Sequence, residues 1–156
     1  MTLAETFALV SFSIFSYADL RYRLVPGIEV FLFGTILLTF PATPIQTGIV
    51  LLACLWGIFC NLSGWFAIPL VFYPPVWPVL FTGYGYRKSI IGRADLLAIS
   101  GLACLFPLPA VLLSLLGLEL WRRLWIRRQQ GNIPALPGLL LGLIVYLLLR
   151  LFLPTP

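Results

Sequence analysis

The chain has 156 residues, of which 61% are hydrophobic and 10% are charged, and its mean hydropathy is +1.05. A soluble domain carries about 25% charged residues. This composition therefore favours an integral membrane protein and leaves no polar stretch long enough for a separate soluble module. The net charge of +5 comes from basic clusters at the ends of apolar runs, so the bilayer, and not nucleic acid, is the expected partner.

Six apolar stretches approach the ~20 residues that a spanning helix needs. They cover about 3–20, 27–40, 45–62, 89–106, 110–125 and 134–153. The first is expected to be a retained span and not a signal peptide, because its basic residues follow the apolar run. The basic clusters predict cytoplasmic loops and place both termini outside. Arg150, near the outer end of the last span, is the exception, and we expect its side chain to snorkel.

The stretch at about 65–82 is apolar but holds four prolines, at 69, 74, 75 and 78. Four prolines argue against one straight spanning helix, so we expect a Pro-broken or re-entrant segment that returns to the cytoplasmic side. In the last span, Gly138 and Gly142 are spaced for close helix packing. The predicted fold is an all-α, polytopic membrane helix bundle of about six transmembrane helices, forming a single domain over 1–156.

Two of the five acidic residues, Asp19 and Asp95, lie at the ends of predicted spans. A carboxylate in or near a bilayer is costly and is a functional hypothesis by default. In the predicted topology both lie near the cytoplasmic face. Two adjacent carboxylates share one proton, so one can activate a water while the other protonates the departing group. The alternative is a set of interface ion pairs, Asp19 with Arg21 or Arg23 and Asp95 with Arg93.

The residues around these aspartates resemble a known family. Asp-Leu-Arg-Tyr-Arg-Leu-Val-Pro at 19–26 is similar to the first aspartate motif of the prepilin and preflagellin peptidases (type IV leader peptidases). Gly-Arg-Ala-Asp-Leu-Leu-Ala at 92–98 resembles the second motif, Gly-x-Gly-Asp-x-Lys-Leu, and is nearer to its archaeal variant, Gly-Gly-Ala-Asp. Ile-Pro-Ala-Leu-Pro at 133–137 resembles the sequence that opens the family's last span.

The resemblance implies a membrane aspartic endopeptidase that removes a short basic leader from pilin-like or archaellin-like precursors at the cytoplasmic membrane face. Asp19 and Asp95 carry over as the catalytic dyad. Gly92 and Ala94 carry over as the loop that shapes the site. No metal and no other cofactor is expected: the sequence has no histidine, no Cys-x-x-Cys pair and no four-cysteine zinc loop.

Three further residues are candidates for binding substrate or shaping the site. Pro26 closes the first motif, and Pro134 belongs to the third, although a proline there also suits the start of a helix. Glu29 follows the first motif and could contact the basic leader of a substrate, or pair with Arg23.

Three positions depart from the family pattern. Gly27 stands where the family has Asn, Arg93 replaces a glycine before the second aspartate, and Leu97 replaces a lysine. A cation beside Asp95 would hinder proton sharing if it pointed inward, and we expect Arg93 to point toward the headgroups.

Two other interpretations stay open. The positions of Tyr17, Asp95 and Pro134 also resemble motifs of the presenilin-like proteases. Those proteins are usually longer, and their first motif is Tyr-Asp. Outside the enzymes, the chain could be a small transporter-like or assembly subunit that uses Asp19 and Asp95 in ion pairs or a proton relay.

Overall fold

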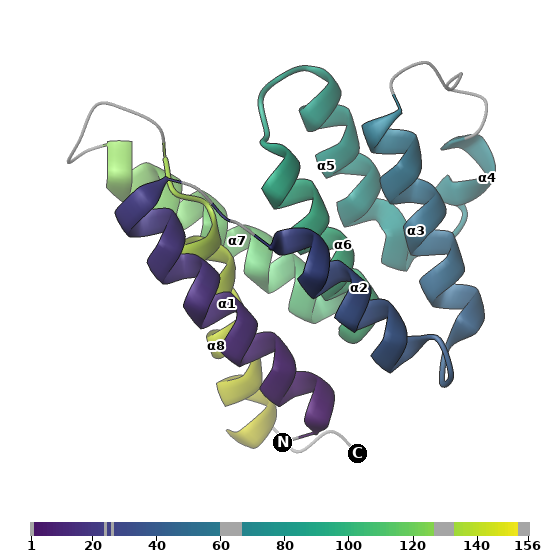
Figure 1. The fold of residues 1–156 in the computed structure, drawn as a ribbon, viewed down its shortest axis with the longest axis horizontal. Coiled ribbons are helices and arrows are strands. Elements are labelled where there is room, and N and C mark those ends of the chain that lie inside the picture. The colour runs from purple at the N-terminus through teal and green to yellow at the C-terminus, as the bar shows by residue number, and fades with distance from the viewer. Residues whose placement is uncertain (1, 24, 26, 60–66, 127–132, 153–156) are drawn as a thin grey trace. The chain divides into compact units, whose positions relative to one another are not determined.

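The computed structural model describes residues 2–23, 25, 27–59, 67–126 and 133–152, and these are helical and contain no strand (Figure 1). The helices are α1 (Leu3–Tyr22), α2 (Ile28–Thr39), α3 (Pro44–Ile58), α4 (Ala67–Val71), the 3₁₀ turn η2 (Pro74–Val76), α5 (Trp77–Arg87), α6 (Arg93–Leu105), α7 (Leu108–Ile126) and α8 (Leu136–Phe152). They confirm the all-α class.

The chain divides into two compact units. Unit 1 consists of residues 1–26 and 109–156, and unit 2 of residues 27–108. The single domain over 1–156 stays a prediction.

The structure does not confirm the six predicted spans. Among the described helices, α1 alone, with 20 residues, is long and apolar enough to cross a bilayer, a property that a signal sequence or a buried core helix can share. The helices α2, α3 and α8 are apolar but shorter, with 12, 15 and 17 residues. Ser89 adopts a left-handed φ of 56° and α6 begins only at Arg93, whereas α7 is long enough but carries Glu119, Arg122 and Arg123.

Unit 1 is built from α1, α7 and α8. α1 packs on α8 through buried residues such as Ala8 and Phe12. α7 and α8 approach closely through glycines, because a Cβ built on Gly117 would lie 2.5 Å from the carbonyl oxygen of Gly138 and 2.9 Å from the Cα of Gly142. The predicted role of Gly138 and Gly142 in close packing is confirmed.

The far end of unit 1 holds an ion pair between Glu5 and Arg150. Glu5 is buried and also accepts a hydrogen bond from the backbone N–H of Thr2, which completes a capping box at the start of α1. Arg150 donates to the Glu5 carboxylate from the last turn of α8. The charge of Arg150 is thus neutralised by a partner, and the expectation that its side chain snorkels stays a prediction.

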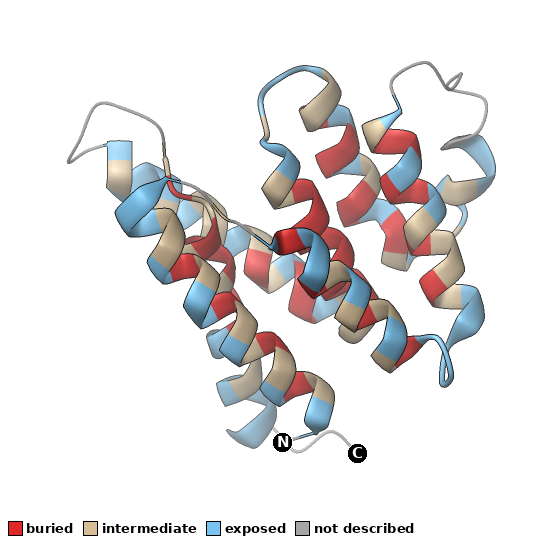
Figure 2. Ribbon diagram, in the orientation of Figure 1, coloured by how far each residue is buried: buried red, intermediate tan, exposed pale blue. Residues whose placement is uncertain are grey.

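Unit 2 is organised around α6. Every residue from Leu96 to Cys104 is buried, and α6 packs against α2, α3 and α5 (Figure 2). A helix that is buried all round belongs to the centre of a bundle. The start of α6, with Arg93, Ala94 and Asp95, projects from this core as a less buried turn.

The proline-rich stretch is broken, as its prolines predict. α4 ends at Val71, Tyr73 is extended, and η2 and then α5 follow, with Pro78 in the first turn of α5. The Nη2 of Arg87, at the end of α5, donates to the carbonyl oxygens of Trp56 (2.9 Å) and Phe59 (3.2 Å). Because those carbonyls end α3, α3 and α5 finish at the same end of unit 2.

Candidate functional site

Asp19 lies in the last turn of α1, where the helix exposes its polar end. Its Oδ2 accepts a hydrogen bond from the backbone N–H of Leu136 at 3.1 Å, and the backbone of Ala135 is a second partner. These amides form the start of α8, and the N-terminus of a helix stabilises a negative charge. Asp19 therefore holds α8 against the end of α1.

This hydrogen bond joins two of the three sequence motifs. Pro134 and Leu136 are buried, and α8 begins at Leu136 with Pro137 in its first turn. The first and third motifs therefore meet at one end of unit 1. Sequence analysis placed Pro134 in the site, and the structure puts it two residues from the amide that binds Asp19. Its role toward a substrate stays a prediction.

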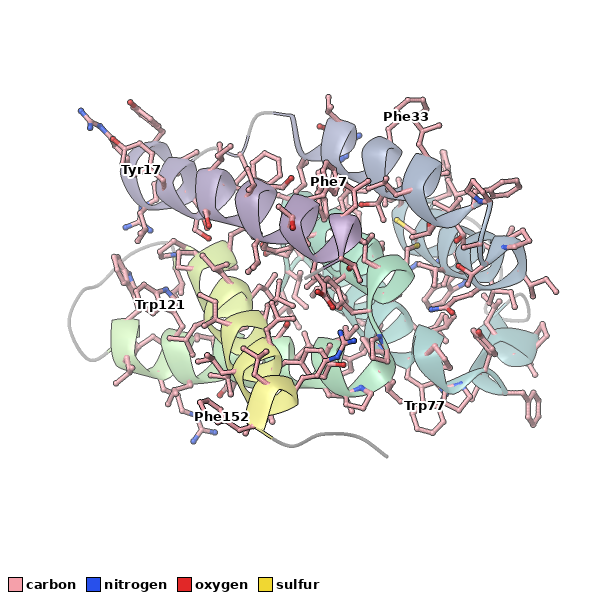
Figure 3. All side chains as sticks on the ribbon, turned by 90° about the horizontal axis from the view of Figure 1, so that it is seen from below. Phe7, Tyr17, Phe33, Trp77, Trp121 and Phe152 are labelled. Carbon is pink, nitrogen blue, oxygen red and sulfur yellow. The ribbon has the colours of Figure 1, made fainter. Side chains whose placement is uncertain are left out.

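The surroundings of Asp19 are aromatic and basic. Arg21 donates to the hydroxyl of Tyr17 at 2.7 Å, and the Arg23 guanidinium lies 4.8 Å from the ring centroid of Trp125. Figure 3 shows the Tyr17 and Trp121 side chains at this same end of unit 1. Aromatic and cationic side chains together are typical of a membrane–water interface. The Asp19 carboxylate accepts its hydrogen bond from α8, and Arg23 is the cation that interacts with it electrostatically. An interface ion pair with Arg21 or Arg23 therefore does not account for all of its contacts.

Asp95 is the third residue of α6. Its Oδ2 accepts the backbone N–H of Gly92, the N-cap, at 3.2 Å. Glycine has no side chain, so only the carboxylate half of a capping box is present. A Cβ on Gly92 would lie 3.4 Å from Asp95 Oδ2, an ordinary contact, so the fold itself does not require glycine there. The site-shaping roles of Gly92 and Ala94 stay predictions.

Arg93 and Glu29 form an ion pair next to Asp95. Arg93 Nη2 lies 3.4 Å from Glu29 Oε1, and the two side chains are 59% and 57% exposed. Within unit 2 the partner of Glu29 is Arg93, because α6 packs on α2 and Arg93 opens α6. The expected pairing of Glu29 with Arg23, which belongs to unit 1, stays a prediction. The expectation that Arg93 points toward the headgroups stays a prediction.

Gly27 explains one departure from the family motif. It is the N-cap of α2 and adopts a left-handed φ of 81°, with nothing within 4 Å of a Cβ built on it. Glycine and asparagine are the residues that adopt this conformation most readily. The exchange of Asn for Gly is thus compatible with this turn. Pro26, the preceding site prediction, lies outside the described residues.

Asp19 belongs to unit 1 and Asp95 to unit 2. Each carboxylate is held by a backbone amide at the start of a helix, and the pairing of the two as a dyad stays a prediction. Among the described residues, no group of three or more His, Cys, Asp or Glu side chains could hold a metal ion. Cys54 and Cys104 are buried, free thiols of the unit 2 core.

Comparison with models of known protein families, with curated proteins and with solved structures found no match.

Sequence reasoning missed three polar contacts, two of them near these aspartates and one at the far end of unit 1. The Glu29–Arg93 pair and the Leu136 amide depend on tertiary packing, and no local pattern indicates either. The Glu5–Arg150 pair had a usable signal, because the predicted topology already placed both side chains on one side of the membrane, at the outer ends of the first and last spans.

Proposed function

We propose that this protein is a membrane-embedded aspartic endopeptidase of the prepilin and preflagellin peptidase type. It would cleave the short basic leader from pilin-like or archaellin-like precursors at the cytoplasmic membrane face. The observation that carries the proposal is the hydrogen bond from the Leu136 amide to Asp19. It brings the first motif together with the third, two segments that resemble this family and lie at opposite ends of the chain.

The distribution of charge in unit 2 supports a membrane setting. All five of its charged residues lie at the start of α2, at or just after the end of α5, or in the first turn of α6. The contacts of Arg87 with the end of α3 and of Arg93 with Glu29 gather these segments at one end. The opposite end, around 40–44 and 105–108, has no charged residue. A bundle with one charged end suits a bilayer, with that end in the cytoplasm.

The exposed surface supports the same setting. Large apolar side chains that are more than half exposed include Val10 and Ile14 on α1, Val30, Phe33 and Leu37 on α2, and Phe81 on α5. Hydroxyl groups are buried instead, among them Thr35, Thr39, Thr47, Thr82, Ser100 and Ser114. Exposed apolar side chains of this size and number favour contact with lipid over contact with water. We therefore propose the six-span arrangement, in which the shorter helices require a locally thin bilayer.

In the proposed mechanism Asp19 and Asp95 share one proton across the scissile peptide bond. The ionised carboxylate takes a proton from a water, which attacks the carbonyl carbon. The protonated carboxyl group then donates its proton to the departing amine. The backbone amides of Leu136 and Gly92 bind one oxygen of each carboxylate and so orient the two side chains.

The test compares Asp19→Asn and Asp95→Asn in cells that co-express a pilin-like precursor. Asparagine keeps an oxygen for the Leu136 or Gly92 amide, so each variant should fold while losing the carboxylate chemistry. Glu119→Gln is the matched control, because Glu119 pairs at the surface of α7 with Arg122 and Arg123. We expect loss of leader cleavage in both aspartate variants and normal cleavage in the control. Unaltered processing in either aspartate variant would rule out the dyad.

A non-enzymatic role is the second candidate, and one observation favours it. Both aspartates bind backbone amides at helix starts, which is what a structural carboxylate does. A small transporter-like or assembly subunit would use them in this way, or as proton-relay groups. In that case the asparagine variants would be well folded, and precursor cleavage would be absent with the wild-type protein too.

A further inference from the structure

A cavity lies between α1 and α8 of unit 1, at the end of these helices away from Asp19. Its volume is about 510 Å³, and five of its eight described lining residues are aliphatic. Leu9 of α1 and Leu147 of α8 form its half-buried walls. A cavity of this size with a mostly apolar lining is typical of a binding site for a small molecule.

The cavity opens to its surroundings along α8. Ile144, Leu148 and Leu151 line it and are exposed. An apolar ligand can therefore enter between these side chains. In the proposed membrane setting they face the hydrocarbon core of the bilayer, so the apolar part of the ligand is expected to be a hydrocarbon chain.

The polar end of the cavity presents a cation to a ligand. It is lined by Thr2, Glu5 and Arg150, and Arg150 donates to the Glu5 carboxylate. The side chain of Glu5 is 9% exposed, whereas that of Arg150 is 52% exposed. Glu5 also accepts the Thr2 amide in the first turn of α1, where the helix N-terminus stabilises its charge. A ligand therefore meets the guanidinium of Arg150 and not the carboxylate of Glu5.

Arg150 can bind a second anion. A guanidinium carries five N–H donors, and within the described part of the chain the hydrogen bond of Arg150 runs from Nη1 to Glu5. The remaining donors on this half-exposed side chain suit the oxygens of a carboxylate or a phosphate, which a guanidinium binds with two parallel hydrogen bonds.

We propose that this cavity binds one acyl chain whose anionic head group, a carboxylate or a phosphate, pairs with Arg150. The aliphatic walls hold the chain, and the guanidinium holds the head group while it keeps its bond to Glu5. A free fatty acid and one chain of an anionic phospholipid share this chemistry. The site includes neither Asp19 nor Asp95, so the inference does not depend on the proposed peptidase activity.

The test uses the full-length protein in phosphatidylcholine vesicles that contain a photoreactive diazirine analogue of a fatty acid or of phosphatidylglycerol. The uncharged counterparts are the fatty acid methyl ester and diacylglycerol. We expect an anionic probe to label the segments 2–9 and 144–151 at about one-tenth of the concentration that its neutral counterpart needs, because a hydrogen bond to a charged group contributes roughly a factor of ten. Labelling by the fatty acid alone assigns a free acid as the ligand, and labelling by phosphatidylglycerol assigns a bilayer lipid.

Variants that fill the cavity should remove the site. Leu147→Trp places a larger side chain in it, and Leu9→Phe does so from the opposite wall, so a folding defect in one variant does not decide the result. Leu149→Trp is the matched control, because Leu149 is exposed on the same helix and is not among the described lining residues. We expect labelling to fall at least about fivefold in both filling variants and to stay within about twofold of wild type in the control.

Arg150→Gln tests the head group. It should make the anionic and neutral probes label equally, with labelling by the neutral probe unchanged. The inference would be overturned if wild type already labels equally with both, if Arg150→Gln keeps the preference for the anionic probe, or if both filling variants label like wild type. Absence of labelling in these two segments by either anionic probe would overturn it as well.

Discussion

The Asp19 carboxylate accepts a hydrogen bond at 3.1 Å from the backbone N–H of Leu136, which lies 117 positions later in the chain. A side chain at the end of α1 thereby satisfies an amide that the first turn of α8 leaves without a helical partner. The same carboxylate is the first member of the proposed dyad. Its role in holding α8 and its proposed role in proton transfer therefore have to be separated experimentally.

Substitution of Asp19 should separate the two roles. Asp19→Ala removes the acceptor and leaves the α8 amide without its partner, so we expect a loss of about 1 kcal/mol in the free energy of unfolding. Asp19→Asn keeps an oxygen acceptor and should lose less. Denaturant unfolding in detergent micelles measures both. Equal losses for the two variants would show that the charge, and not the hydrogen bond, holds α8.

The glycine contact between α7 and α8 predicts a steric effect. A Cβ on Gly142 would lie 2.5 Å from the Cα of Ser114, so Gly142→Ala must push the helices apart at a cost of about 1–3 kcal/mol. Gly48 of α3 is the matched control, because a Cβ there meets nothing within 4 Å. Gly48→Ala should be neutral or stabilising by up to about 1 kcal/mol. A thermal shift of the same sign in both variants would contradict the close approach.

The turn at Gly27 predicts a conformational effect without a steric one. Since φ is 81° and the surrounding space is open, Gly27→Asn should cost little, and Gly27→Val should cost about 1–2 kcal/mol through left-handed strain. Thermal unfolding of the two variants checks this. If valine is tolerated as well as asparagine, the left-handed turn is not required in the folded protein.

Removing either partner of the Glu5–Arg150 ion pair should lower the free energy of unfolding, but by different amounts. Arg150→Leu leaves the buried Glu5 carboxylate without its cation, and we expect a loss of about 1–2 kcal/mol, modest because Arg150 is half-exposed. Glu5→Gln should cost less, since glutamine keeps an acceptor for the Thr2 amide and leaves Arg150 in contact with water. Chemical unfolding of both variants, and of the pair combined, gives the coupling energy. Additive losses would mean that the ion pair contributes nothing.

The charged end of unit 2 predicts an orientation in the membrane. In a background without native cysteines, Lys88→Cys and Ala42→Cys place single thiols at the two opposite ends of the unit, both at exposed positions. A membrane-impermeant maleimide should label position 88 only from the cytoplasmic side and position 42 only from outside. Labelling of both thiols from one side would exclude a spanning unit 2 and with it the six-span arrangement.

Much of the fold follows from local sequence signals. Proline and glycine mark the ends of α2 and the break before α5, and apolar length predicts α1 and α8 to within two residues at all four of their ends. The spans predicted at 27–40, 45–62 and 89–106 are longer than α2, α3 and α6, whereas the span predicted at 110–125 is shorter than α7. For α6 the reason is that hydropathy does not register a left-handed residue such as Ser89. The contacts of the candidate site are harder to predict from the sequence. Asp19 and Asp95 stand out as rare acids, whereas the partners of Glu29 and Arg93 depend on which helices pack together.

The discontinuity of unit 1 has a consequence for how the protein is made. All of unit 2 is encoded between α1 and α7, so its helices can pack as soon as residue 108 has been synthesised. α1 must wait until α8 emerges before the Leu136 amide and the Arg150 guanidinium become available to it. Contacts over such sequence separations form late and slowly. If Asp19 is catalytic, the chain becomes competent only after its last helix is in place, and truncated products of interrupted translation would be inactive.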